Sequence, residues 1–160
     1  MIRDAVEADL PTIVTIYNAT IPCQIVTADF APVTIESRLD WFLAHTHDRP
    51  LWVMEINGTV AGWLGFRSFY GRPAYQSTAE LSLYVHPDCQ RMGIGRKLLG
   101  RAIEMAPALK IATLLGFIFA DNHPSLKLFQ QFEFEQWGYL PRVAKFDRGE
   151  QDLVILGRRI

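Results

Sequence analysis

The sequence has little of what marks secreted or membrane-spanning proteins. It contains two cysteines, Cys23 and Cys89, which fit reduced thiols better than a disulfide framework. The segment Met1–Asp4 carries charge where a secretory signal needs an apolar core. The longest mainly apolar run, residues 111–120, is far shorter than the roughly 20 residues that a membrane span needs. We therefore expect a cytoplasmic protein with no membrane partner.

An excess of charge of one sign is also lacking. The formal net charge is −1, from 16 Lys and Arg against 17 Asp and Glu, and the basic residues form no stripe. Binding to nucleic acid would need such a stripe, so we expect no nucleic-acid partner. No spacing of Cys and His suggests zinc, and no metal is expected. With no repeat or linker, the chain is predicted to be a single domain, residues 1–160.

What the sequence does have is a periodicity that changes from segment to segment. Apolar residues at helical spacing predict helices from Leu10 and from Ile35, with Asp9 and Thr34 as N-caps. Strands are predicted at residues 2–5, 51–56, 59–66, 78–85, 113–120, 134–140 and 153–156, and further helices at 95–105 and 125–132. Asn57-Gly58 predicts a hairpin. This order predicts a mixed sheet with helices packed on it.

One loop between a predicted strand and a predicted helix carries chemistry: Gln90-Arg91-Met92-Gly93-Ile94-Gly95-Arg96. Glycines let such a backbone turn tightly, and unpaired amides at a helix start attract phosphate. The loop is not a dinucleotide fingerprint, because Leu98 stands at the third glycine position. It is not a P-loop either, because Arg101-Ala102 stands where Lys and Ser or Thr are needed. From two glycines alone, a simple turn is the favoured interpretation.

In its context this loop resembles motif A of the GNAT superfamily of acetyltransferases, because Q-R-x-G-x-G follows the extended segment Glu80–Pro87. The resemblance implies an α/β (mixed α+β) fold with a central, mostly antiparallel sheet of about six to seven strands and helices on both faces. It also implies acetyl-CoA as co-substrate, with the pyrophosphate on the loop and the pantetheine arm beside a splayed strand. The cofactor-binding residues that it implies are Leu83, Tyr84, Val85, Arg91, Met92, Gly93, Ile94, Gly95, Arg96, Asn122 and Ser125. For Asn122 a cap role at the start of the following helix can coexist with the ligand role, whereas for Ser125 a cap role alone is the favoured interpretation.

Nearly the whole chain is similar to one branch of that superfamily, the phosphinothricin and methionine sulfoximine N-acetyltransferases. The similar segments are Ile2–Ala5, Ile16–Asn18, Phe66–Tyr75 and Thr78–Ser82. The resemblance implies transfer of an acetyl group to the α-amino group of a small amino acid or analogue, such as phosphinothricin, methionine sulfoximine or methionine sulfone. It also implies a homodimer.

The residue that the resemblance places as general base is Glu80. An ammonium group must lose a proton before it attacks a thioester, and a nearby carboxylate can take that proton. A salt-bridged strand residue is the alternative interpretation. A backbone amide near Leu83 or Val85 can stabilise the thioester oxygen. The general acid stays open, because Phe129 stands where many GNAT enzymes have Tyr.

The remaining assignments are less specific. Tyr84 and Tyr139 are both candidates for the general acid. For the acceptor, Arg72 can hold a carboxylate bidentately, with Pro73, Ala74 and Tyr75 lining the site. An exposed loop charge is an equal alternative for Arg72, and Arg67 is a less favoured substitute.

Other functions stay open at this point. The chain can acetylate another amine, such as a peptide N-terminus or a polyamine. An aminoglycoside is disfavoured, because no acidic cluster is present. It can also be a CoA-binding regulator without turnover, for which Phe129 argues mildly and against which Glu80 argues. A structural or interaction domain without a CoA site is the last alternative.

Overall fold

The computed structural model describes residues 1–160. The strands are β1 (Ile2–Asp4), β2 (Leu51–Ile56), β3 (Thr59–Ser68), β4 (Thr78–Val85), β5 (Thr113–Phe119), β6 (Glu135–Phe146) and β7 (Gly149–Arg159). The helices are α1 (Leu10–Asn18), α2 (Ile35–Leu43), α3 (Ile94–Met105) and α4 (His123–Gln130). No helix has both the length and the apolar character needed to cross a membrane.

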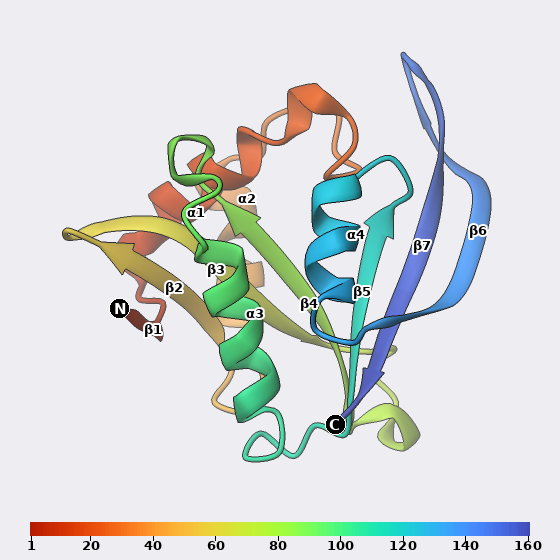
Figure 1. Cartoon of the computed structure of the whole chain (residues 1–160). Coiled ribbons are helices and arrows are strands. Elements are labelled where there is room, and N and C mark those ends of the chain that lie inside the picture. Colours follow the sequence, from red (N-terminus) through yellow and green to blue (C-terminus); the bar gives the residue numbers. More distant parts are fainter.

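All the strands belong to one seven-stranded sheet in the order β1-β2-β3-β4-β5-β7-β6. Only the β4–β5 pair is parallel, and every other pair is antiparallel. Helices α3 and α4 cover one face of the sheet, and α1 and α2 cover the other face near β2, β3 and β4 (Figure 1). The predicted mixed, mostly antiparallel sheet with helices on both faces is therefore confirmed.

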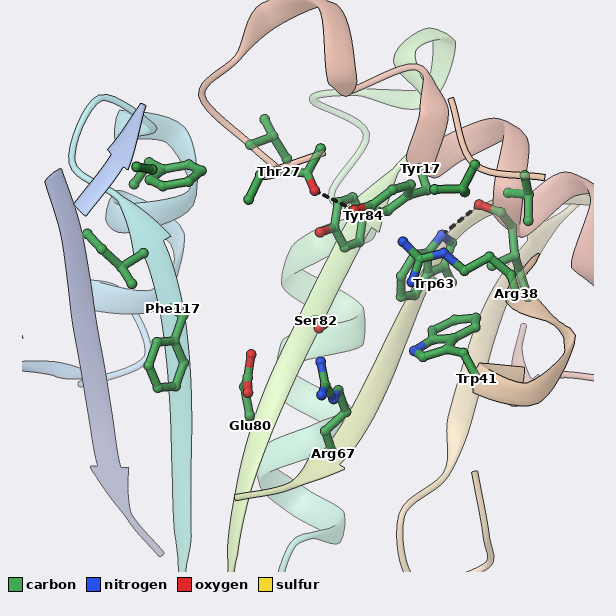
Figure 2. A pocket seen from close by; sticks show the side chains of 18 of the residues that line it. Tyr17, Thr27, Arg38, Trp41, Trp63, Arg67, Glu80, Ser82, Tyr84 and Phe117 are labelled. Atoms are coloured by element: carbon green, nitrogen blue, oxygen red, sulfur yellow. Dashed lines mark hydrogen bonds between the residues drawn. The ribbon is translucent and has the colours of Figure 1, made fainter. Parts of the chain in front are cut away.

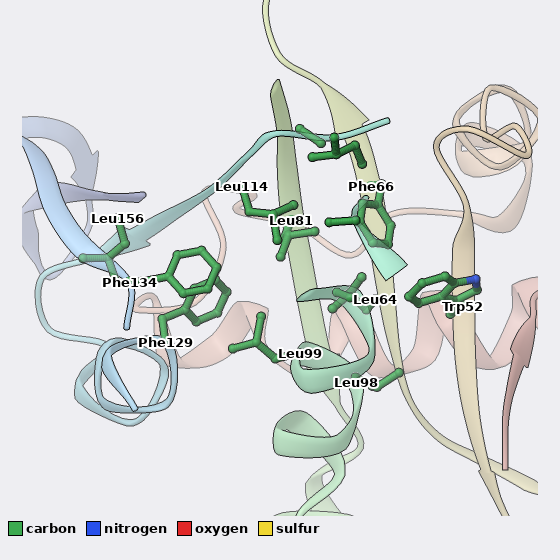
Figure 3. Packing of buried hydrophobic residues seen from close by; sticks show 14 of the residues in the cluster. Trp52, Leu64, Phe66, Leu81, Leu98, Leu99, Leu114, Phe129, Phe134 and Leu156 are labelled. Carbon is green, nitrogen blue, oxygen red and sulfur yellow. The ribbon is translucent and has the colours of Figure 1, made fainter. Parts of the chain in front are cut away.

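The larger core lies between the sheet and helices α3 and α4. Leu98 and Leu99 of α3 are fully buried there, together with Leu114 of β5 (Figure 3). Phe129 of α4 packs edge-on against Phe134, with ring centroids 4.9 Å apart. Burial of this apolar face is the main force that holds the sheet and these two helices together.

The smaller core lies on the opposite face, under α1 and α2. Ile13 and Ile16 of α1 pack there on Val53 and Trp63 of the sheet. The Trp63 indole N–H donates to the Ile13 carbonyl oxygen at 3.2 Å, so this buried polar group is satisfied. The two short helices cover only part of this face, and the uncovered part holds a cavity.

The β4–β5 pair is interrupted in a way that no other pair shows. Its residues pair only from Thr78–Glu80 to Thr113–Leu115, at the beginning of both strands. Beyond that point the strands diverge, and their upper ends in Figure 1 stand well apart. The rest of β4 has a neighbour on its β3 side alone, so a gap opens in the middle of the sheet.

Local signals explain several element ends. Asn57 and Gly58 both have positive φ, as the predicted hairpin turn requires. The Thr34 hydroxyl accepts from the Ser37 amide at 3.1 Å and caps α2, as expected. The predicted cap at Asp9 is wrong. Its carboxylate accepts instead from the Arg3 guanidinium and the Val6 amide, which fixes β1 against the start of α1.

The last two strands are longer than the sequence predicts. Both extend further toward the turn that joins them, and β7 also extends further toward the C-terminus. We expected residues 134–140 and 153–156, whereas β6 and β7 form a long hairpin. Strand β6 lies at the sheet edge and is exposed along most of its length, so its sequence has no clean alternation. Pro141 and the positive φ of Arg142 fall at a register shift, which an edge strand tolerates.

Candidate active site

The loop between β4 and α3 presents a row of free amides. Arg91 and Gly93 have φ of 63° and 78°, which turns the chain into the start of α3. No side chain caps this helix, and the backbone amides from Arg91 to Arg96 donate no hydrogen bond within the chain. Together with the helix dipole, they form a site for an anion such as a pyrophosphate. A side chain at Gly95 would press on Leu128 at 3.0 Å, so α3 and α4 approach closely there.

Backbone groups of β4 also face the gap in the sheet. The His86 amide donates to the Ala61 carbonyl at 2.8 Å, on the β3 side. Because hydrogen bonding alternates along an antiparallel strand, Ser82 and Tyr84 also bond toward β3. The amides and carbonyls of Leu83 and Val85 therefore point toward β5, where no strand pairs with them. An extended ligand with amides of its own can pair with this edge.

Asn122 and Ser125 lie across the gap, at the start of α4. Together with residues of β4 and β5 they line a cleft of about 110 Å³. The Asn122 Oδ1 atom accepts from the Ser125 amide at 3.3 Å and so caps the helix. The Asn122 Nδ2 group and the Ser125 hydroxyl have no partner in the chain, so both are available to a ligand in the cleft. The expectation that Asn122 caps the helix is confirmed, and its ligand role stays a prediction. The expectation that Ser125 is a cap is wrong, because its amide donates to Asn122 and its hydroxyl bonds to no group of the chain.

Glu80 lies where this cleft meets a larger cavity on the α1 and α2 face (Figure 2). The cavity has a volume of about 430 Å³, and Glu80, Ser82 and Tyr84 form part of its β4 wall. Burial raises the pKa of the Glu80 carboxyl, and the positive charge of Arg67 opposes that rise. A carboxylate that is half-buried and open to both spaces can exchange a proton with a ligand that spans them.

Comparison with known proteins shows the family to which this chain belongs. Residues 13–134, more than half of the chain, match the Acetyltransferase (GNAT) family. This chain belongs to that family. The membership predicted from motif A is thereby confirmed, and the GNAT domain described here is an acetyltransferase.

Several relatives of this GNAT chain are named for acetylation of amino-acid analogues. YwnH of Bacillus subtilis, provisionally named a phosphinothricin acetyltransferase, is 49% identical, and the match covers 99% of this chain and 98% of YwnH. The L-methionine sulfoximine/L-methionine sulfone acetyltransferase of Salmonella typhimurium is 33% identical, over 92% of this chain and 87% of its own. A crystal structure of a Sinorhizobium meliloti phosphinothricin acetyltransferase in complex with acetyl-CoA has a TM-score of 0.93 at 26% identity. That match covers 100% of this chain and 88% of the other.

The position at which many GNAT enzymes have a tyrosine is structural in this chain. Phe129 is 3% exposed, and its ring lies on β5 at Gly116, where an added Cβ would meet the ring at 2.8 Å. Of the two candidate tyrosines, Tyr84 lines the cavity and stacks on Trp63 at 4.5 Å. Burial raises the Tyr84 pKa, so the hydroxyl keeps its proton. Tyr139 is exposed on β6, donates to Asp152, and does not line the cavity.

The predicted acceptor segment Arg72–Tyr75 lies outside the cavity lining. All of its residues are exposed, and Pro73–Tyr75 form a short helical turn before β4. The segment reaches the cavity through aromatic contacts: Tyr75 lies 5.5 Å from Phe69, and Phe69 lies 6.5 Å from Phe117, which lines the cavity wall. The segment therefore lies near the cavity without lining it, and its role in substrate binding stays a prediction.

Several cavity residues were not expected from the sequence. Tyr17, Arg38 and Trp41 reach the cavity from α1 and α2, and Phe117 reaches it from β5 (Figure 2). Arg38 pairs with Asp29 at 3.1 Å and lies 4.7 Å above the Tyr17 ring. Helical periodicity does not distinguish a core face from a cavity face, so the spacing of Trp41 alone could not reveal its place in the cavity.

Proposed function

We propose that this enzyme transfers the acetyl group of acetyl-CoA to the α-amino group of a small amino acid or analogue, with Glu80 as general base. The class of acceptor is that of phosphinothricin, methionine sulfoximine and methionine sulfone, which the names of its relatives point to. The observation that carries the proposal is the position of Glu80, which lines both the cleft in the sheet and the larger cavity.

Acetyl-CoA fits the groups that the chain leaves unpaired. The free amides from Arg91 to Arg96 suit its pyrophosphate. The β5-facing edge of Leu83 and Val85, with the Asn122 side-chain amide opposite, suits the pantetheine arm, which carries amide groups of its own. We therefore keep Leu83–Val85, Arg91–Arg96, Asn122 and Ser125 as the proposed co-substrate site.

The proposed reaction is a direct transfer. Glu80 takes a proton from the acceptor ammonium, and the amine then forms a C–N bond to the thioester carbon while the C–S bond breaks. The nitrogen gives up a second proton as the amide forms, which balances the proton that the leaving thiolate gains. A free backbone amide at Leu83 or Val85 stabilises the thioester oxygen as its negative charge grows. The leaving thiolate takes up a proton, for which Tyr84 is the candidate donor that lines the cavity. No covalent acetyl-enzyme is needed.

The test is thiol release from acetyl-CoA with a panel of acceptors: methionine sulfone, methionine sulfoximine, phosphinothricin, a tripeptide and spermidine. We expect release with the amino-acid analogues and a large loss in Glu80→Gln. Release with the tripeptide or spermidine alone would replace the acceptor class. Binding of acetyl-CoA without release for any acceptor would favour the regulator alternative.

The oligomeric state and the cellular location are separate expectations. We propose a cytoplasmic homodimer, as the family resemblance implies. Exposed apolar side chains on β6, among them Trp137 and Val143, support a surface that a second copy covers. Light scattering of the purified protein would decide between a dimer and a monomer.

A further inference from the structure

The cavity holds few charged groups, and only one of its two cations has no partner. The charged residues that line it are Arg38, Arg67 and Glu80. Arg38 is already engaged, by its ion pair with Asp29 and by the Tyr17 ring beneath it. The Arg67 guanidinium forms no hydrogen bond, ion pair or aromatic contact in the chain. It is the free cation of the cavity, and its charge is available to a ligand.

The pairing of β3 with β4 places Arg67 next to Glu80. In the register of β3 and β4, Arg67 lies directly opposite Glu80. Side chains at directly opposite positions leave the same face of a sheet, with Cβ atoms about 4.5–5.5 Å apart. Figure 2 shows both side chains on the cavity side of their strands. They share no hydrogen bond, and Arg67 acts on Glu80 through its charge alone.

An α-amino acid carries its amine and its carboxylate on one carbon atom. Whatever holds the carboxylate must therefore lie beside the base that deprotonates the amine. Arg67 is itself exposed, but it lines the cavity opposite Glu80 and so meets this condition, whereas Arg72 lies on a loop that does not line the cavity. We propose that Arg67 binds the α-carboxylate of the acceptor and so selects free α-amino acids over peptides and polyamines. This inference rests on the proposed function and replaces the sequence-based assignment of the carboxylate to Arg72.

The same arrangement disfavours the other amines. A peptide N-terminus has an amide in place of the α-carboxylate, so it would leave the Arg67 charge without a counter-ion beside Glu80. A polyamine would bring a second positive charge into a cavity that already holds Arg38 and Arg67. Selection against both acceptors therefore follows from one side chain.

The experiment compares one acceptor with and without its carboxylate. Wild type, Arg67→Gln, Arg67→Lys and Arg72→Gln are assayed with L-methionine sulfone and with its carboxamide. Charge-assisted hydrogen bonds of this kind are worth about 10- to 100-fold in kcat/KM. We expect Arg67→Gln to lose that factor for methionine sulfone, mainly through KM, and to change less than about threefold for the carboxamide. Arg67→Lys should recover part of the loss, and Arg72→Gln should leave the ratio of the two acceptors unchanged.

Two results would overturn the inference while the proposed function stands. One is an equal loss on both acceptors in Arg67→Gln, or no loss on either. The other is a selective loss of methionine sulfone in Arg72→Gln, which would return the carboxylate to the loop. If wild type acetylates spermidine or a tripeptide but no amino acid, the proposed function itself fails, and the inference fails with it. Acetyl-CoA affinity, measured by calorimetry, should be the same in every variant and controls for folding.

Discussion

The two faces of the sheet are used differently. On the α3 and α4 face, a cluster of 20 buried residues forms the larger core, whereas the buried cluster on the α1 face has 6 residues and adjoins the cavity that Glu80 lines. Strand β4 takes part in both, because alternate side chains leave opposite faces. Leu81 points into the large core, while Glu80 and Ser82 point into the cavity. Adjacent residues of β4 thus serve different purposes: Leu81 contributes to the stability of the core, while Glu80 and Ser82 contribute to the cavity.

The largest effect should come from the cavity face. Glu80→Gln removes the base with almost no change of shape, so kcat/KM should fall by about 10²- to 10⁴-fold.

The same variant also tests the effect of Glu80 on stability. Because burial raises the Glu80 pKa, the folded state binds this proton more tightly than the unfolded state does. Stability contributed by this group is therefore lost as pH rises through its folded pKa. The variant should accordingly melt at the same temperature as wild type or higher at pH 7.5, by calorimetry. A clear fall in Tm would contradict the separation of the two faces.

The matched change on the core face should do the reverse. Leu98→Ala removes a side chain that is 0% exposed, so the free energy of unfolding should fall by about 2–5 kcal/mol. Denaturant titration measures that loss. Below the unfolding transition, kcat with a saturating acceptor should stay within about threefold of wild type, because Leu98 does not line the cavity. A loss of kcat as large as that in Glu80→Gln would show that the faces are coupled.

The two candidate acids, Tyr84 and Tyr139, differ in whether they line the cavity. Tyr84→Phe should lower kcat by about 10-fold or more, because a donor in the cavity is lost. Tyr139→Phe, outside the cavity, should leave kcat unchanged and serves as the matched control. Equal activity in both variants would leave water as the acid.

The smallest effect should be a shift in pH dependence. Since burial raises the Glu80 pKa, the acid limb of kcat/KM should lie above the range of an ordinary carboxyl group. Arg67 opposes that rise, so Arg67→Gln should move the limb further toward higher pH. The profile should be recorded with the carboxamide acceptor, for which Arg67 has no proposed binding role. A shift toward lower pH would contradict this role of the Arg67 charge.

The sequence predicts elements well where one face is buried and fails where none is. Strand β4 was predicted with its observed bounds, because Leu81 and Ala79 alternate with Glu80 and Ser82. The long hairpin of β6 and β7 was predicted too short, since exposed edge residues show no such alternation. The Asn57-Gly58 turn was predicted correctly, because both residues adopt positive φ readily.

The candidate site also has one part that the sequence predicts and one part that it does not. The loop from Arg91 to Arg96 is contiguous in the chain, so its chemistry can be recognised from the sequence. The cavity is assembled from α1, α2, β3, β4 and β5, and its members are far apart in the chain. Arg67 lies opposite Glu80 only because of the register of β3 and β4. The long loop between these strands leaves that register undetermined in the sequence. Such a pairing requires the structure.

The gap between β4 and β5 also has a mechanical consequence. Three residue pairs are all that join the strands β1–β4 to the strands β5–β7 within the sheet, so the molecule has a seam. Under a pulling force, or in slow opening motions, the two halves should part along this line first. A ligand that hydrogen-bonds to both sides of the seam would hold the two halves of the sheet together. The concentration of acetyl-CoA would then set how often the sheet opens and how long the protein survives proteolysis.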